Sequence, residues 1–272
     1  MSSKGRVNTV SIMSDQRLIN AVVGLSQVMV DLRAKCPWDS AQTHVSLRRY
    51  LIEECHEVLD ALDRSDPDDL AAELGDLLFQ IWFHAEIAAD GHEDRGLAAI
   101  IEHVTAKLVR RHPHIFGDNA VDGASGAKAS WEAIKQAEGR GRESRLDGVP
   151  PFIPALLGAQ CLQEKAASVG FDWDDVGDVL AKVQEEVGEL RAELGDEGTD
   201  ARRQHEFGDL LLSLVNFGRH IGINAEDALR EANARFTSRF QFIEQSAVNS
   251  GRSISDLSLD EMEILWQAAK RR

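Results

Sequence analysis

Proline, tyrosine and cysteine are scarce in this chain of 272 residues, which has 6, 1 and 3 of them respectively. The low proline content, together with abundant Ala, Leu, Glu and Asp, favours helices. The three cysteines are Cys36, Cys55 and Cys161. Because they have no close pairing in the sequence, they indicate neither a disulfide framework nor a zinc site, and a reducing compartment fits them.

Long apolar runs and a surplus of positive charge are also missing. The most apolar stretch, residues 77–89, is interrupted by Gln80, His84 and Glu86, so it is too short and too polar to span a bilayer. Acidic residues outnumber basic ones by 46 to 30, which gives a formal net charge of −16. This charge repels nucleic acids and anionic membranes, so neither is an expected partner. The first 16 residues have no apolar signal core, and we expect a cytoplasmic protein.

Apolar residues recur with helical periodicity along almost the whole chain. The pattern predicts helices over residues 15–34, 41–63, 66–90, 95–111, 131–138, 154–168, 175–194, 200–221, 225–247 and 259–270. Residues 117–130 are rich in Gly and Ala, which predicts a mobile loop. Residues 139–153 contain Gly, Pro and charged residues, which predicts an interdomain linker.

Four short motifs occur twice, in the same order. They are W-D at 38–39 and 173–174, E-E-x-x-E at 53–57 and 185–189, E-x-G-D-L-L at 73–78 and 206–211, and W-x-x-x-K at 131–135 and 266–270. Four ordered matches indicate an internal duplication. We therefore predict an all-α fold of two tandem helical-bundle modules, residues 1–138 and 154–272.

The repeated acidic motifs have the spacing of one helix face. Residues three or four apart lie on the same face, so Glu186 and Glu189 project together, with Glu185 beside them. Glu206 and Asp209 do the same on the next predicted helix. If the two helices form an antiparallel hairpin, these carboxylates meet, and a divalent cation relieves their repulsion. An all-oxygen ligand set favours Mg²⁺ or Mn²⁺. A single such motif is usually a solvated face, but here both motifs occur in both halves.

Cationic and aromatic residues near the carboxyl end of the chain suggest a polyanionic substrate. Arg235 and Arg239 share a helix face, Asn233 precedes them, and Lys270 follows Trp266 by one turn. In the acidic motif itself, Lys182 lies one turn before Glu186. Arg, Lys and Mg²⁺ together match phosphate oxygens, and Trp266 could pack on a flat base. An ordinary exposed face for the arginines and a core position for Trp266 remain open alternatives.

The combination of motifs resembles the MazG family of nucleoside triphosphate pyrophosphohydrolases. The E-E-x-x-E and E-x-G-D-L-L motifs carry the resemblance, together with CPWDSAQTHVSL, RRHPHIFGD and WEAIK in the first half. In the second half it rests on PALLGAQCLQEKAASVGFDW, on HEFGDLLLSLVNFGRHIGINAEDALREANARFTSRF and on LDEMEILWQAAK. The resemblance covers residues 18–270.

Membership of this family implies Mg²⁺-dependent cleavage of ribo- and deoxyribonucleoside triphosphates to the monophosphate and pyrophosphate, in a homodimer. It implies that the metal ligands are Glu186, Glu189, Glu206 and Asp209, which with Glu185 form the catalytic set. It implies that the triphosphate or nucleotide contacts are Lys182, Glu185, Arg203, Arg235, Arg239, Trp266 and Lys270, and we add Asn233 to these substrate-binding candidates. Arg235 stands where the family commonly has Lys, which keeps the charge but alters the geometry.

The first half keeps the acidic motif but changes its cationic neighbours. A second metal site is predicted at Glu54, Glu57, Glu73 and Asp76. Tyr50 takes the place of Lys182, while Lys107 and Arg111 stand roughly where Arg235 and Arg239 do. We therefore predict that the second module is the main catalyst.

Three other functions remain open. One is a related all-α enzyme restricted to a single nucleotide, such as dUTP or phosphoribosyl-ATP. Another is a nucleotide-binding regulator without turnover, although such a protein would be expected to have a broken acidic motif. The third is a ferritin-like di-iron site, suggested by Glu53-x-x-His56, but the second copy has Gly188 in the histidine position.

Overall fold

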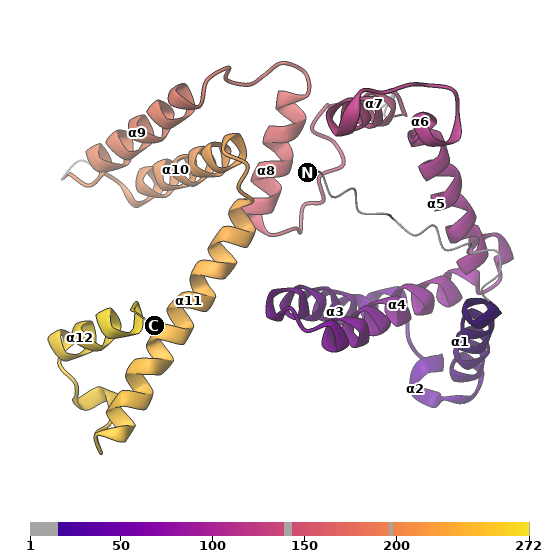
Figure 1. The fold of residues 1–272 in the computed structure, drawn as a ribbon, viewed down its shortest axis with the longest axis horizontal. Helices are drawn as coiled ribbons and strands as arrows, with labels where there is room; N and C mark the ends of the chain where they lie inside the picture. Colours follow the sequence, from indigo (N-terminus) through magenta and orange to yellow (C-terminus); the bar gives the residue numbers. More distant parts are fainter. Residues whose placement is uncertain (1–15, 139–142, 196–197, 272) are drawn as a thin grey trace, which may run out of the picture. The chain divides into compact units, whose positions relative to one another are not determined.

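The protein is described here by a computed structural model that covers residues 16–138, 143–195 and 198–271. Within these ranges the chain forms helices and turns and no strand, which confirms the predicted all-α class. The chain divides into two compact units, Met1–Gly139 and Arg140–Arg272, which we call the first and second unit (Figure 1). Residues 1–15 of the predicted first module and residues 139–142 of the predicted linker lie outside the described ranges.

The helices of each unit follow one another along the chain with short connections (Figure 1). The first unit contains α1 (Gln16–Lys35), α2 (Pro37–Ser40), α3 (His44–Arg64), α4 (Pro67–Ala89), η2 (Glu93–Arg95), α5 (Leu97–Arg111), α6 (Pro113–Phe116) and α7 (Gly123–Glu138). The second unit contains α8 (Ala155–Ala167), α9 (Val176–Glu193), α10 (Asp200–His220), α11 (Ala225–Asn249), η3 (Ile254–Asp256) and α12 (Leu259–Ala269).

A helical hairpin dominates each unit, α3 with α4 in the first and α9 with α10 in the second. The turn between α3 and α4 is sharp because Ser65 adopts a left-handed conformation with φ 57° and Asp66 then caps α4 ahead of Pro67. In the second hairpin, the Thr199 side chain caps α10 by accepting a hydrogen bond from the Arg202 amide. Local capping chemistry therefore sets where each pair of helices turns back.

Apolar burial holds the first hairpin against α1. Phe83, Met29, Leu47 and Trp82 form a cluster in which Phe83 and Met29 are fully buried. In the second unit the buried apolar residues are Val179, Val183, Val215, Ile243 and Ala247. Val179, Val183 and Val215 of this set lie on α9 and α10, the helices that also carry the acidic motifs.

The predicted loop over residues 117–130 is wrong in its second half, because α7 begins at Gly123. Ala124, Ala127 and Ala129 are strong helix formers, and their contribution exceeds the cost of the interspersed glycine. Gly123, at the start of the helix, has φ +63°, a left-handed conformation that glycine adopts without steric cost. The helix predicted to begin at residue 131 therefore starts eight residues earlier.

A search of the described residues for membrane-spanning segments finds no helix with the length and apolar character that a bilayer crossing needs.

Replacing Phe83 with alanine is expected to lower the free energy of unfolding by about 3–5 kcal/mol, because the ring is fully buried and leaves a cavity. Phe116→Ala is the matched control, since that ring is 62% exposed and its loss should change stability by less than about 0.5 kcal/mol. Urea denaturation followed by circular dichroism measures both. Equal midpoints for the two variants would contradict the assignment of this core.

Candidate functional site

The second-unit cluster consists of Glu186 from α9 with Glu206 and Asp209 from α10. Each of these residues offers a carboxylate oxygen, and the three oxygens lie within 4.8 Å of one another. The structure thus brings together three of the four ligands predicted for this site. They meet because α9 and α10 pack against each other as the hairpin on which the prediction depended.

Glu189, the fourth predicted ligand, lies beside this cluster rather than within it. Desolvation raises the pKa of its carboxyl group, and the charges of Glu186 and Glu206 raise it further. Carboxylates on both helices of the hairpin therefore act on the Glu189 side chain. Repulsion of this kind among carboxylates is relieved when a cation binds between them.

Lys182 is the cation that the structure places nearest to the second-unit cluster. Its Nζ lies 2.6 Å from Glu186 Oε1 and 2.8 Å from Glu185 Oε1. These hydrogen bonds, the one to Glu185 first, raise the pKa of the ammonium well above its ordinary value. Lys182 is therefore positively charged at all physiological pH values and partly neutralises the acidic site.

One oxygen of Glu186 is left without a partner, although the residue is only 4% exposed. Oε1 is paired with Lys182, but Oε2 is buried and has no hydrogen bond within the described chain. Burying a carboxylate oxygen without a partner costs free energy, and a hydrogen-bond donor or a metal ion at this position would remove that cost. With Glu206 and Asp209 beside it, the donor set is all oxygen and fits a hard divalent cation.

A pocket of about 220 Å³ opens next to this acidic group and is lined by Lys182, Glu186 and Asp209 at one end. Phe171 and Trp173, from the segment before α9, also line it. The pocket thus joins a charged region to an aromatic one. Such a combination suits a ligand with an anionic part and a flat apolar part.

The wall of the pocket contains a charged network that the sequence patterns did not single out. Arg219 donates both terminal nitrogens to Asp172 and also donates to the Asn216 side-chain oxygen, and His220 lies 2.9 Å from Asp172. The Arg219 hydrogen bonds are the main cause that lowers the pKa of Asp172 to about 2. The only signal in the sequence was the recurrence of Trp173-Asp174, which lies directly beside Asp172.

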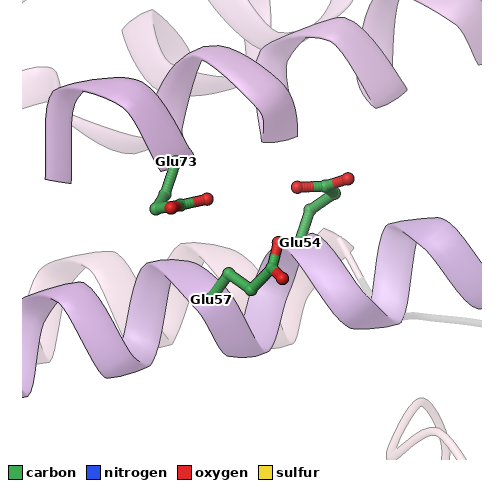
Figure 2. A group of neighbouring side chains, drawn as sticks. All are labelled: Glu54, Glu57 and Glu73. Atoms are coloured by element: carbon green, nitrogen blue, oxygen red, sulfur yellow. The ribbon is translucent and has the colours of Figure 1, made fainter. Parts of the chain in front are cut away.

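The first-unit cluster consists of Glu54 and Glu57 on α3 and Glu73 on α4. Figure 2 shows the three carboxylates converging between the two helices, and their oxygens lie within 4.8 Å of one another. Desolvation is the first cause that raises the pKa of Glu54 and of Glu73, and the charges of Glu57 and Asp76 add to it. Asp76, the fourth predicted ligand, thus acts on the cluster from its edge.

The neighbours of the first-unit cluster differ from those of the second. Tyr50, the counterpart of Lys182, accepts a hydrogen bond from Arg49 and packs edge-on against Trp38. It therefore supplies no positive charge to the carboxylates. His56 is exposed and is not among the residues that converge there, so the di-iron alternative gains no support from the described residues.

The remaining predicted substrate contacts do not line the pocket formed by the described residues. Trp266 packs against Phe236, with ring centroids 5.3 Å apart, and the Arg239 guanidinium lies 5.5 Å from its ring. Arg235 pairs with Glu231 at 3.3 Å. Asn233 is exposed on α11, and Lys270 caps the end of α12. These residues form a separate group on α11 and α12.

Arg203 has a structural position at the turn of the second hairpin. Its Nε donates to the Glu193 carbonyl at 2.9 Å, and one terminal nitrogen donates to the Gly198 carbonyl at 3.1 Å. The side chain thereby satisfies one carbonyl at the end of α9 and one just before α10, and it fixes the connection between the two helices. It supports the hairpin that carries the acidic residues.

Sequence comparison relates the chain to one family over nearly its whole length. The family model of the MazG nucleotide pyrophosphohydrolase domain matches residues 42–116, which include the first-unit cluster. The nucleoside triphosphate pyrophosphohydrolase of Escherichia coli (strain K12) is 41% identical over 258 residues, or 93% of this chain and 97% of that protein. The nucleoside triphosphate pyrophosphohydrolase/pyrophosphatase MazG of Thermotoga maritima is 40% identical over 253 residues, or 90% and 94%. The uncharacterized protein YabN of Bacillus subtilis is 46% identical over 239 residues, or 86% of this chain and 48% of that protein.

Glu186→Gln is expected to weaken binding of Mg²⁺ or Mn²⁺ to the second unit by at least about 10-fold, because it removes a charged oxygen donor. Glu244→Gln, an exposed position on α11, is the matched control and should bind as the wild type does. Isothermal titration calorimetry measures the affinity. Since the pKa of Glu189 is raised, affinity should fall as the pH drops through that pKa, where protons compete with the cation. Unchanged affinity in Glu186→Gln would contradict the cation site.

Proposed function

The chain belongs to the MazG family, and from this we propose that it is an enzyme that hydrolyses nucleoside triphosphates to the monophosphate and pyrophosphate. The observation that carries the proposal for this chain is the second-unit cluster, with its buried, unpartnered Glu186 oxygen beside Lys182 and the pocket. We assign the two units to two MazG-like modules and the main catalytic role to the second.

Mg²⁺, with Mn²⁺ as the substitute, is the proposed cofactor. Glu186, Glu189, Glu206 and Asp209 would hold it, which agrees with the all-oxygen donor set and the raised pKa of Glu189. When bound, the ion neutralises charge on the phosphates and polarises their phosphorus–oxygen bonds.

The chain's own groups then perform the hydrolysis. A glutamate of the site, Glu185 or Glu186, orients a water molecule and accepts its proton. The water oxygen bonds to the α-phosphorus, the bond from that phosphorus to the bridging oxygen breaks, and pyrophosphate leaves. Lys182 is close enough to the carboxylates to contact a phosphate oxygen bound beside them. Its location favours stabilisation of the charge that develops on the phosphates.

The proposed homodimer gives a role to the substrate-binding candidates on and after α11, which are Arg235, Arg239, Trp266 and Lys270. Phe236 is 58% exposed and Ile264 is 68% exposed on α11 and α12, which makes this face suited to contact a second copy. In such a dimer the α11 arginines of one copy could reach the phosphates held by the other.

The rival functions are less well supported. A regulator without turnover does not need converging carboxylates, yet both units have them. A single-nucleotide enzyme shares the chemistry proposed here and differs in its choice of base. We also propose that the enzyme controls the cytoplasmic nucleotide pool, a role that broad substrate use would serve.

Incubation of the purified protein with a panel of triphosphates and Mg²⁺ in H₂¹⁸O is expected to yield monophosphate and pyrophosphate. The label should enter the monophosphate, because the water oxygen attacks the α-phosphorus. Ion-exchange chromatography and mass spectrometry identify the products and the labelled species. Diphosphate with orthophosphate, or label in pyrophosphate, would overturn the proposed reaction.

Glu186→Gln and Glu54→Gln are matched substitutions at equivalent positions of the two motifs. We expect Glu186→Gln to lower kcat by at least about 100-fold, since it removes a proposed ligand, and Glu54→Gln to keep kcat within about 3-fold. Steady-state pyrophosphate release measures both, with circular dichroism to verify folding. The opposite pattern would transfer the main catalytic role to the first unit.

A further inference from the structure

Two histidines meet at the open end of the first hairpin, away from the first-unit cluster. His44 is the first residue of α3 and His84 lies near the end of α4, so the hairpin brings them together. Their Nδ1 atoms are 2.8 Å apart, while the ring centroids are 5.1 Å apart and the ring planes differ by 1°. The rings therefore face each other edge to edge with the two nitrogens between them, which is the geometry of an N–H···N hydrogen bond.

The outer nitrogens of the two rings have different surroundings. His84 Nε2 is buried and has no hydrogen bond within the described chain, whereas His44 is exposed, so water can satisfy its Nε2. Two neutral imidazoles carry two N–H groups in all, and one of them lies between the Nδ1 atoms. No N–H lacks an acceptor when His84 donates to His44 and the second proton is on His44 Nε2. The buried Nε2 of His84 is then a bare lone pair.

One further proton has no favourable position in this pair. If the hydrogen bond between the Nδ1 atoms is kept, both Nε2 atoms must carry hydrogen. The Nε2 of His84 is then a buried N–H without an acceptor in a positively charged pair. If that Nε2 stays bare, two N–H groups face each other across 2.8 Å. Protonation therefore opposes the contact between the two helices in either case.

The charged groups around the pair do not offset this effect. Burial first, and then the charge of His44, lower the pKa of His84. Arg33 of α1 pairs with Asp90, and Glu86 of α4 accepts a hydrogen bond from an indole N–H. Within the described residues neither histidine pairs with a carboxylate. The other charged or titratable residues described near this end of α3, after α4 and at the start of α5 are exposed, and they are Arg48, Arg49, His92, Asp94, Arg95 and Glu102.

The second hairpin shows that histidines are not needed at these positions to close such a structure. Counted from the E-E-x-x-E motif, His44 corresponds to Val176, which is likewise the first residue of its helix. Counted from the E-x-G-D-L-L motif, His84 corresponds to Phe217. Valine and phenylalanine bind no proton, so the histidine pair gives the first hairpin a response that the second hairpin lacks.

We propose that His44 and His84 form an acid-sensitive latch, which holds the first hairpin closed while both rings are neutral and releases its open end when the pair takes up a proton. Because the folded chain lowers the pKa of His84, the stabilisation is complete above the ordinary value of 6.5 and is lost as the pH falls below it. The same hairpin carries the first-unit cluster, so the latch regulates how firmly those three carboxylates are held together.

Hydrogen exchange followed by mass spectrometry at pH 7.5 and 5.5 tests the latch in the whole chain. After correction for the intrinsic pH dependence of exchange, peptides over residues 47–52 of α3 should open about 10-fold more often at the lower pH, the scale of one lost buried hydrogen bond. Peptides at the start of α9 are the internal reference and should change by less than about 2-fold. His103→Gln, an exposed position on α5, is the matched control and should keep the wild-type response.

The double variant His44→Val with His84→Phe gives the first hairpin the pair of the second. Its exchange should differ by less than about 2-fold between the two pH values, whereas loss of a merely structural contact would speed exchange at both. Equal opening of the wild type at both pH values, or an acid response retained in the double variant, would overturn the latch.

Nuclear magnetic resonance of the wild type with ¹⁵N-labelled histidine decides the question even if the double variant does not fold. A scalar coupling across the N–H···N bond identifies the pair, and its His84 ring should stay neutral, with the proton on Nδ1, while the exposed histidines titrate. Titration of His84 together with the exposed histidines would contradict the latch. Neither measurement uses a nucleotide, so failure of the hydrolase proposal would leave this result unaffected.

Discussion

Repulsion among carboxylates held on a helical hairpin is the constraint on which the second unit depends. Glu186, Glu206 and Asp209 approach within 4.8 Å, and their neighbour Glu189 has a raised pKa. Apolar contacts must hold the helices together against this repulsion. Val179, Val183 and Val215 supply buried apolar surface on the same two helices, so the hairpin keeps its geometry while the acidic face remains a source of binding energy for a cation.

The two units show how one substitution changes what the same hairpin can do. In the second unit, Lys182 pairs with two glutamates and brings a positive charge to the pocket. In the first unit, Tyr50 occupies the equivalent place and engages Arg49 and Trp38. A metal-binding acidic face needs only the carboxylates, but a phosphate group also needs a cationic partner. The first unit therefore has the converging carboxylates but lacks the lysine that we propose serves an anionic substrate in the second unit.

Local periodicity made the hairpins and the acidic clusters predictable, whereas the pocket depended on contacts remote in sequence. Residues three apart on a helix must share a face, so the motif spacing sufficed for Glu206 and Asp209. The contact of Asp172 with Arg219 joins residues 47 apart, and that of Gln163 with Leu212 joins residues 49 apart. No helical period connects such pairs. The family resemblance implied a substrate contact for Arg203, whereas its hydrogen bonds to Glu193 and Gly198 depend on turn geometry that no helical period shows.

The charge of the acidic site determines in what form a substrate can enter it. Four carboxylates, those of Glu186, Glu189, Glu206 and Asp209, face a single nearby ammonium, that of Lys182, in a chain whose formal net charge is −16. A bare triphosphate is itself a polyanion and would be repelled. A triphosphate accompanied by divalent cations reverses this balance, because the ions attract both the carboxylates and the phosphates. The acidic surface that disfavours nucleic-acid polymers is thus compatible with a metal-bound nucleotide, and under the proposed function the cation is a condition of substrate binding as well as of bond cleavage.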